Sequence, residues 1–184
     1  RSGADMLNST IANDSLPAYL MEQGFLYGMA ADGGDLEAAR RGITSYTRFL
    51  ETQPNYSFGW ANLAALNWQL GETDVAIANM REAIHLAPTA APYWMQLGLY
   101  LEATGDREDA RDAYSQAVLN DADIVLMTEW GTTTLQAEFS ETDPSLRRQV
   151  FTLLRNRQAE AALALWQTDT TLHSNSLNCA VQAL

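Results

Sequence analysis

The fold of this chain is decided by two consecutive segments of equal length. Residues 57–90 read SFGWANLAALNWQLGETDVAIANMREAIHLAPTA, and residues 91–124 read APYWMQLGLYLEATGDREDARDAYSQAVLNDADI. A shift of 34 residues superposes like on like: Trp60 on Trp94, Leu63 on Leu97, Gly71 on Gly105, Ala76 on Ala110, Ala83 on Ala117 and Ile84 on Val118. Self-similarity at a fixed period of this length indicates repeated units that stack on one another.

Each segment is predicted to form two helices. Residues 57–70 carry apolar side chains at helical spacing, and Gly71 ends this helix because glycine tolerates a positive φ. Thr73 and Asp74 are expected to cap the second helix, over about 74–86. Pro88 closes the unit because it has no N–H to donate to a continuing helix.

Small residues set the distance between the paired helices. Ala76 and Ala83 lie two turns apart on one face of the second helix and permit close approach. We expect Trp60, and Trp94 in the next unit, to fill the remaining space. One helix pair cannot bury this face alone, so the sequence predicts an all-α solenoid of stacked antiparallel helix pairs.

The two segments resemble tetratricopeptide repeats. The residues that carry the resemblance are Trp60, Leu63, Gly71, Ala76, Ala83 and Pro88 in the first unit, and Trp94, Leu97, Gly98, Tyr100, Gly105, Ala110, Tyr114 and Ala117 in the second. The second unit departs from the pattern at its end, where Ala122 replaces the closing proline. The resemblance implies a right-handed superhelix with a concave groove.

Further repeats are expected on both sides. Upstream, residues 20–56 fit a longer repeat with its turn at Gly34 and Asp35 and its second helix over about 35–52. Ser15 and Pro17 are expected to begin its first helix. The repeats then span 15–124, after an N-terminal extension over 1–14. Downstream, the sequence predicts an irregular connector over 125–142, a degenerate repeat over 143–176 and a partial helix over 177–184.

The resemblance also implies a binding surface. In tetratricopeptide proteins the first helices of successive units line the groove that partners occupy. The corresponding positions here are Phe58, Asn62, Ala65, Trp68 and Gln69 in one unit, Met95, Gln96, Leu99 and Glu102 in the next, and Met21, Phe25 and Gly28 in the upstream unit. The carboxylate clamp of chaperone-binding members is broken, because Pro92 and Gln96 stand where that pattern has bases.

Composition excludes several classes of function. The chain has 184 residues, 23 acids against 11 bases and a net charge of −12, whereas nucleic-acid binding needs a basic face. All the bases are Arg, and no apolar stretch is long enough to span a bilayer. The acidity serves either solubility or attraction to a basic partner.

Catalytic chemistry finds no support in the sequence. The two histidines, His85 and His173, have no metal-ligand partners at a recognisable spacing, and Cys179 has no nearby base. Phosphate-binding loops and nucleophile elbows are missing. We therefore predict a non-enzyme without cofactor or metal.

The leading hypothesis is a scaffold that binds a protein or peptide in the groove. A looser resemblance to the soluble tails of bacterial O-antigen ligase or polymerase-like membrane proteins implies an alternative, an extracytoplasmic accessory domain. Self-association of stacked repeats is a third hypothesis, suggested by the partial helix over 177–184. The sequence indicates a bacterial protein, and it does not decide between the cytoplasmic and the extracytoplasmic side of the envelope.

Overall fold

The computed structural model describes residues 3–121, with side chains from residue 16 onward, and the single residues 124, 149, 152, 153, 156, 158, 161, 164 and 165. The chain divides into two compact units, unit one (residues 1–88) and unit two (residues 89–184). The helices of the described residues are α1 (Gly3–Asp32), α2 (Leu36–Thr52), α3 (Ser57–Gln69), α4 (Thr73–Leu86), α5 (Ala91–Thr104) and α6 (Arg107–Asn120).

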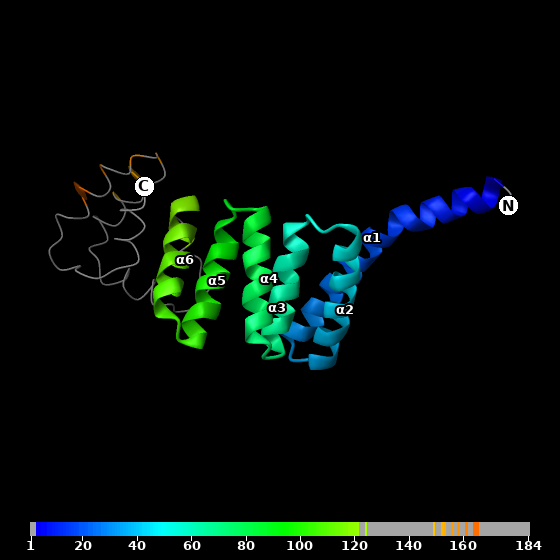
Figure 1. Ribbon diagram of the computed structural model, residues 1–184, viewed down its shortest axis with the longest axis horizontal. Coiled ribbons are helices and arrows are strands. Elements are labelled where there is room, and N and C mark those ends of the chain that lie inside the picture. The colour runs from blue at the N-terminus through cyan, green and yellow to red at the C-terminus, as the bar shows by residue number, and fades with distance from the viewer. Residues whose placement is uncertain are drawn as a thin grey trace. The chain divides into compact units, whose positions relative to one another are not determined.

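The predicted all-α fold is confirmed. Consecutive helices pack as pairs, with α1 against α2, α3 against α4 and α5 against α6 (Figure 1). Within unit one, α3 also packs against α2 and α1, so the two helix pairs of this unit are stacked. The predicted helix spans 35–52, 57–70 and 74–86 agree with α2, α3 and α4 to within one residue at each end.

The turn inside each pair has the same hydrogen-bonded form. Gly34, Gly71 and Gly105 have φ values of 93°, 77° and 91°. The N–H that follows each glycine donates to a carbonyl five residues earlier: Asp35 to Ala30 (3.4 Å), Glu72 to Asn67 (2.9 Å) and Asp106 to Leu101 (2.9 Å). This is the Schellman motif, in which a glycine past the helix end lets the last carbonyls find donors. Gly71 and Gly105 therefore end α3 and α5 through this motif, in agreement with the prediction that a glycine stops the first helix of each pair.

The capping prediction for α4 is wrong. Its N-cap is Glu72 and no side chain bonds to the free N–H groups, while Thr73 is already helical. Acidic caps do occur in the other pairs. The Asp35 carboxylate accepts from the N–H groups of Glu37 and Ala38 at 3.0 Å each, and the Asp106 carboxylate accepts from Asp109 at 3.3 Å.

The start of the first helix was also predicted wrongly. Ser15 and Pro17 do not begin a helix, because α1 starts at Gly3 and continues through both residues. Figure 1 shows this segment of α1 reaching beyond the other helices of unit one. Proline removes one backbone hydrogen bond, and the turns on either side are intact, so the helix passes through it.

Unit one has a core in which aromatic and aliphatic side chains from α1, α2 and α3 meet. The fully packed residues are Leu20, Ala31, Ala39, Tyr46, Phe49, Leu50, Leu63 and Leu66. The Tyr46 ring lies against Gly24, where an added Cβ would be 2.9 Å from ring carbons. Gly24 therefore serves helix packing.

The predicted tryptophan positions are at the edge of the core. Trp60 is only partly buried against it, and its Nε1 donates to the Pro54 carbonyl at 2.8 Å. Trp94 is likewise partly exposed. Neither indole is therefore fully buried between the paired helices, whereas the sequence had suggested that each fills the space there.

The small positions of the repeat are confirmed as buried. Ala76, Ala83 and Ala117 are 0 % exposed, and Ala110 is 2 % exposed. Leu63 and Leu97 are buried as well, at 8 % and 5 %. In unit two the Tyr114 ring of α6 packs onto Gly98 of α5, where a Cβ would overlap ring carbons.

The predictions for the downstream part concern the connector over 125–142, the degenerate repeat over 143–176 and the partial helix over 177–184. Except for the single positions named above, these segments lie outside the described residues.

Candidate functional site

The first helices of the two pairs in unit one form a shallow pocket. Its volume is about 110 Å³, and its lining is Phe25, Gly28, Met29, Asp32, Tyr46, Asn62, Ala65, Leu66 and Gln69. The residues from α1 recur at helical spacing, as do those from α3, so each helix turns one face toward the pocket. The structure therefore brings together Phe25, Gly28, Asn62, Ala65 and Gln69 of the predicted binding surface.

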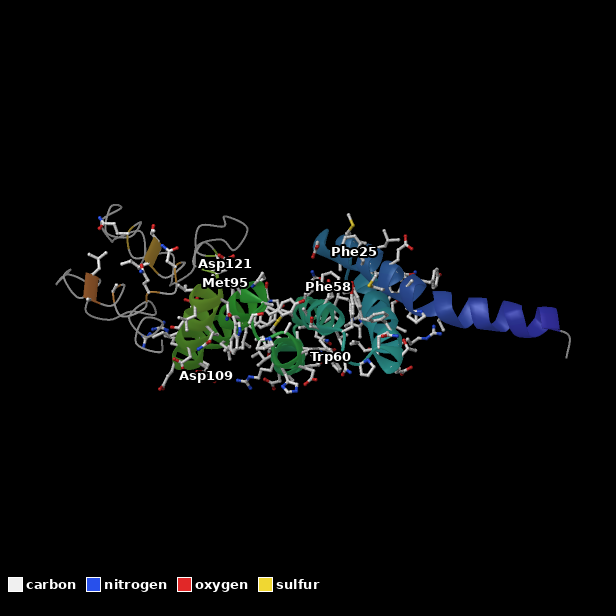
Figure 2. All side chains as sticks on the ribbon, turned by 90° about the horizontal axis from the view of Figure 1, so that it is seen from above. Phe25, Phe58, Trp60, Met95, Asp109 and Asp121 are labelled. Atoms are coloured by element: carbon white, nitrogen blue, oxygen red, sulfur yellow. The ribbon has the colours of Figure 1, made fainter. Side chains whose placement is uncertain are left out.

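The rim of the pocket is apolar and open to solvent. Phe25 is 50 % exposed and Met29 is 59 % exposed, although both are large hydrophobic residues. Phe58 continues the same face of α3 one turn before Asn62 and is 42 % exposed. Figure 2 shows Phe25 and Phe58 on one edge of unit one and Trp60 on the opposite edge. Exposed aromatic side chains beside a hollow are typical of protein interaction sites.

Polar side chains connect the two helices at one end of the pocket. The Gln69 Nε2 of α3 donates to the Asp32 Oδ1 of α1 at 2.6 Å. On α3, the Asn62 Nδ2 donates to the Phe58 carbonyl at 2.7 Å, which fixes the orientation of that amide. No basic residue lines the pocket, so its only formal charge is the Asp32 carboxylate.

Two buried polar atoms of the pocket lining have no hydrogen-bond partner among the described residues. They are the Tyr46 hydroxyl and the Gln69 Oε1. Tyr46 is only 1 % exposed, and its burial raises the pKa of the phenol to about 12, so the hydroxyl keeps its proton at neutral pH. Buried polar atoms are nearly always hydrogen-bonded in proteins, so the two unpaired atoms are an exception in this lining.

The remaining predicted positions lie elsewhere. Trp68 is partly exposed and lies outside the pocket lining, while Met21 is partly buried against the core of unit one. In unit two, Met95 is 0 % exposed, so its predicted place on an open surface is wrong. Met95 is labelled in Figure 2 and belongs to α5 of unit two.

Three further predicted positions belong to unit two. Gln96, Leu99 and Glu102 are partly exposed on α5. The Glu102 carboxylate accepts a 2.5 Å hydrogen bond from the Tyr114 hydroxyl, so it stabilises the contact between α5 and α6. Glu102 therefore has a role within its own helix pair.

Sequence reasoning missed Met29, Asp32, Tyr46 and Leu66. A signal for two of them was present, because Phe25, Gly28, Met29 and Asp32 follow the i, i+3, i+4, i+7 spacing of one helix face. Tyr46 and Leu66 reach the pocket from within the core, and no pattern in one helix predicts that.

Among the described residues, no group of three or more His, Cys, Asp or Glu side chains comes together where it could hold a metal ion. In the same part of the chain, no helix combines the length and the apolar character needed to cross a membrane.

The paired helices, their glycine turns and the open face of α1 and α3 define a helical repeat protein. A family model of the tetratricopeptide repeat matches residues 59–89 and 91–124, so these two segments are tetratricopeptide repeats, as the sequence predicted. None of the curated proteins compared with the chain matches it.

Solved structures support the same fold. The chain is similar to the crystal structure of MamA, with a TM-score of 0.56 and 18 % sequence identity over 89 % of this chain and 86 % of that chain. At this identity the likeness concerns the fold. Tetratricopeptide repeats bind proteins or peptides, so the two matched segments support an interaction scaffold.

Proposed function

We propose that the chain is a non-catalytic scaffold that binds a segment of another polypeptide across α1 and α3 of unit one. The observation that supports this is the pocket with its exposed rim, where Phe25, Met29 and Phe58 leave apolar surface open. A few residues, often aromatic, supply most of the affinity in protein interfaces. A segment lying along this face would place side chains in the pocket and main-chain groups near Asn62.

Peptides selected from a random displayed library against the wild-type chain provide the test. Phe25→Ala and Phe58→Ala should each weaken the selected peptides about tenfold, or about 1.4 kcal/mol, because each removes an aromatic contact. Val75→Ala is the matched control, since Val75 is an exposed apolar residue of α4 (48 %) outside the pocket lining. Equal losses in all three variants, or none, would contradict the proposal.

Self-association is a second candidate with an observation of its own. Tyr19 and Leu26 of α1 are 57 % and 59 % exposed, and neither lines the pocket. Repeat proteins cover such apolar helix faces by stacking another unit on them. The mass from light scattering should rise with concentration in the wild type and stay monomeric in Leu26→Arg. A monomeric wild type at every concentration counts against this candidate.

The extracytoplasmic accessory role is a separate proposal, supported by the looser resemblance alone. It requires a parent gene with a multi-span hydrophobic region upstream of this segment, and sequencing that gene tests it.

A further inference from the structure

We infer that the pocket between α1 and α3 binds the guanidinium group of an arginine in the bound segment. The inference rests on the proposed function and adds the chemical class of the side chain that the pocket takes. It follows from the two unpartnered polar atoms, the neighbouring carboxylate and the size of the pocket.

The size of the hollow suits the end of one side chain. The pocket has a volume of about 110 Å³. Sites for whole metabolites or cofactors usually measure about 300–1,000 Å³. An engineered cavity of about 150 Å³ takes up a benzene molecule. A planar guanidinium is slightly smaller than benzene and suits the space.

Hydrogen-bonding chemistry requires a donor. The Gln69 Oε1 can only accept, and the Tyr46 hydroxyl can accept as well as donate. The Gln69 Nε2 is already engaged with Asp32, so the amide is held with its oxygen as the remaining group. An apolar side chain here would leave both buried atoms unpaired, and an anion would meet acceptors and a carboxylate.

Charge and shape favour arginine among the donors. The only charged group in the lining is Asp32, and a carboxylate that accepts one bond at Oδ1 has further capacity to accept. A guanidinium offers five N–H donors in a rigid plane, whose face can stack on Phe25 and whose stem can cover Met29. The net charge of −12 attracts a basic segment to the chain as a whole.

The test titrates the whole chain with single-residue probes and follows its amide signals by NMR. The probes are Nα-acetyl-arginine amide, its neutral isostere Nα-acetyl-citrulline amide, the lysine derivative and the apolar norleucine derivative. We expect the arginine probe to shift the signals of Gly28, Ala65 and the Gln69 side-chain amide. Its affinity should be about tenfold higher than that of citrulline, a difference typical of charge-assisted hydrogen bonds.

Three variants connect the affinity to the named atoms. Asp32→Asn keeps an acceptor for Gln69 and should weaken the arginine probe about tenfold while leaving citrulline unchanged. Gln69→Met removes the buried acceptor and should weaken both probes. Asp74→Asn, which removes an exposed acid of α4 outside the lining, is the control and should change neither. A thermal melt of each variant checks that it is folded.

Several results would overturn the inference. Equal binding of arginine and citrulline would show that no charge is recognised, and tightest binding of norleucine would show an apolar pocket. A lysine probe that binds as well as arginine would remove the role of the planar group. If no probe shifted the amide signals in a saturable way, the pocket would hold only solvent.

Failure of this inference can be distinguished from failure of the proposed function. A library-selected peptide that is lost in Phe25→Ala and retained in Asp32→Asn leaves the scaffold function standing and rejects the arginine pocket. A peptide that is retained in both variants and in Phe58→Ala rejects binding at this face, whatever the probes show.

Discussion

The ring of Tyr114 on α6 lies directly on Gly98 of α5, so closely that α5 has no room there for a Cβ atom. Unit one repeats this arrangement with Tyr46 on Gly24. In the segment between them, the positions that align with Gly98 and Tyr114 at a shift of 34 residues are Ala64 and Met80, which are buried at 0 % and 2 %. Where Ala64 replaces the glycine on the first helix, Met80 replaces the tyrosine ring on the second. This exchange keeps the packing between paired helices dense.

Gly98→Ala should destabilise the chain. The added methyl overpacks the interface at a cost of about 1–3 kcal/mol, which exceeds the gain of about 0.5–1 kcal/mol in helix propensity. Thermal unfolding should show a net loss of about 1–2 kcal/mol. The double variant Gly98→Ala, Tyr114→Met, which copies the Ala64 and Met80 combination, should recover part of it. A double variant no more stable than Gly98→Ala would contradict the matched packing.

Gly28→Ala provides the opposite case on α1. A Cβ at Gly28 meets nothing within 4 Å, so the substitution should stabilise the helix by about 0.5–1 kcal/mol. The same methyl protrudes into the pocket that Gly28 lines. Peptides selected on the wild type should therefore bind this more stable variant less tightly. Unchanged affinity in titration calorimetry would place the bound segment away from Gly28.

Alkaline pH should destabilise the fold through its buried tyrosines. Burial raises the pKa of Tyr46 to about 12 and raises the pKa of Tyr100 as well, and in Tyr114 the hydrogen bond to Glu102 adds to the effect of burial. A tyrosine titrates near pH 10 in an unfolded chain. Because the folded pKa is the higher one, the stabilisation is fully present below about pH 10 and is lost as the pH rises toward about 12.

Urea denaturation between pH 7 and about 11.5 measures this loss. We expect a decrease in unfolding free energy on the order of 1–2 kcal/mol above about pH 10. The chain has no lysine to titrate in that range, so the tyrosines dominate the decrease. Tyr46→Phe should make the profile flatter. A decrease that begins near pH 8, or an identical profile in Tyr46→Phe, would assign the effect to other groups.

Met95→Ala separates burial from binding in unit two. Met95 is 0 % exposed, so truncation should cost about 2–5 kcal/mol through the cavity that it leaves. At a temperature where the variant is fully folded, its affinity for selected peptides should equal that of the wild type. Circular dichroism gives the stability and calorimetry gives the affinity. Reduced affinity at full stability would restore Met95 to the binding surface.

Local signals allowed the helix pairs to be predicted closely. A glycine that needs positive φ, such as Gly71 or Gly105, ends a helix at a fixed residue whatever surrounds it. The alanines at positions 76 and 83 are constrained by packing, because both are 0 % exposed. Single residues in the sequence are enough to predict such features.

Other features depend on contacts that the sequence does not display. The helical face of Met95 could be assigned either to the core or to the groove, and only the packing of α5 decides it. The pocket needs Tyr46 from α2 beside Gln69 from α3, which no single periodicity predicts. Pro17 was misread because proline both begins helices and is tolerated inside them when neighbouring turns hold.

The hydrogen bond from Gln69 to Asp32 fastens the first helix pair to the second. A side chain bound beside this hydrogen bond would contact both α1 and α3 and so connect the two helix pairs. Detaching α1 and α2 by pulling on the N-terminal end should then require more force in the complex than in the chain alone. Each bound segment would therefore make the contact between the two helix pairs stiffer.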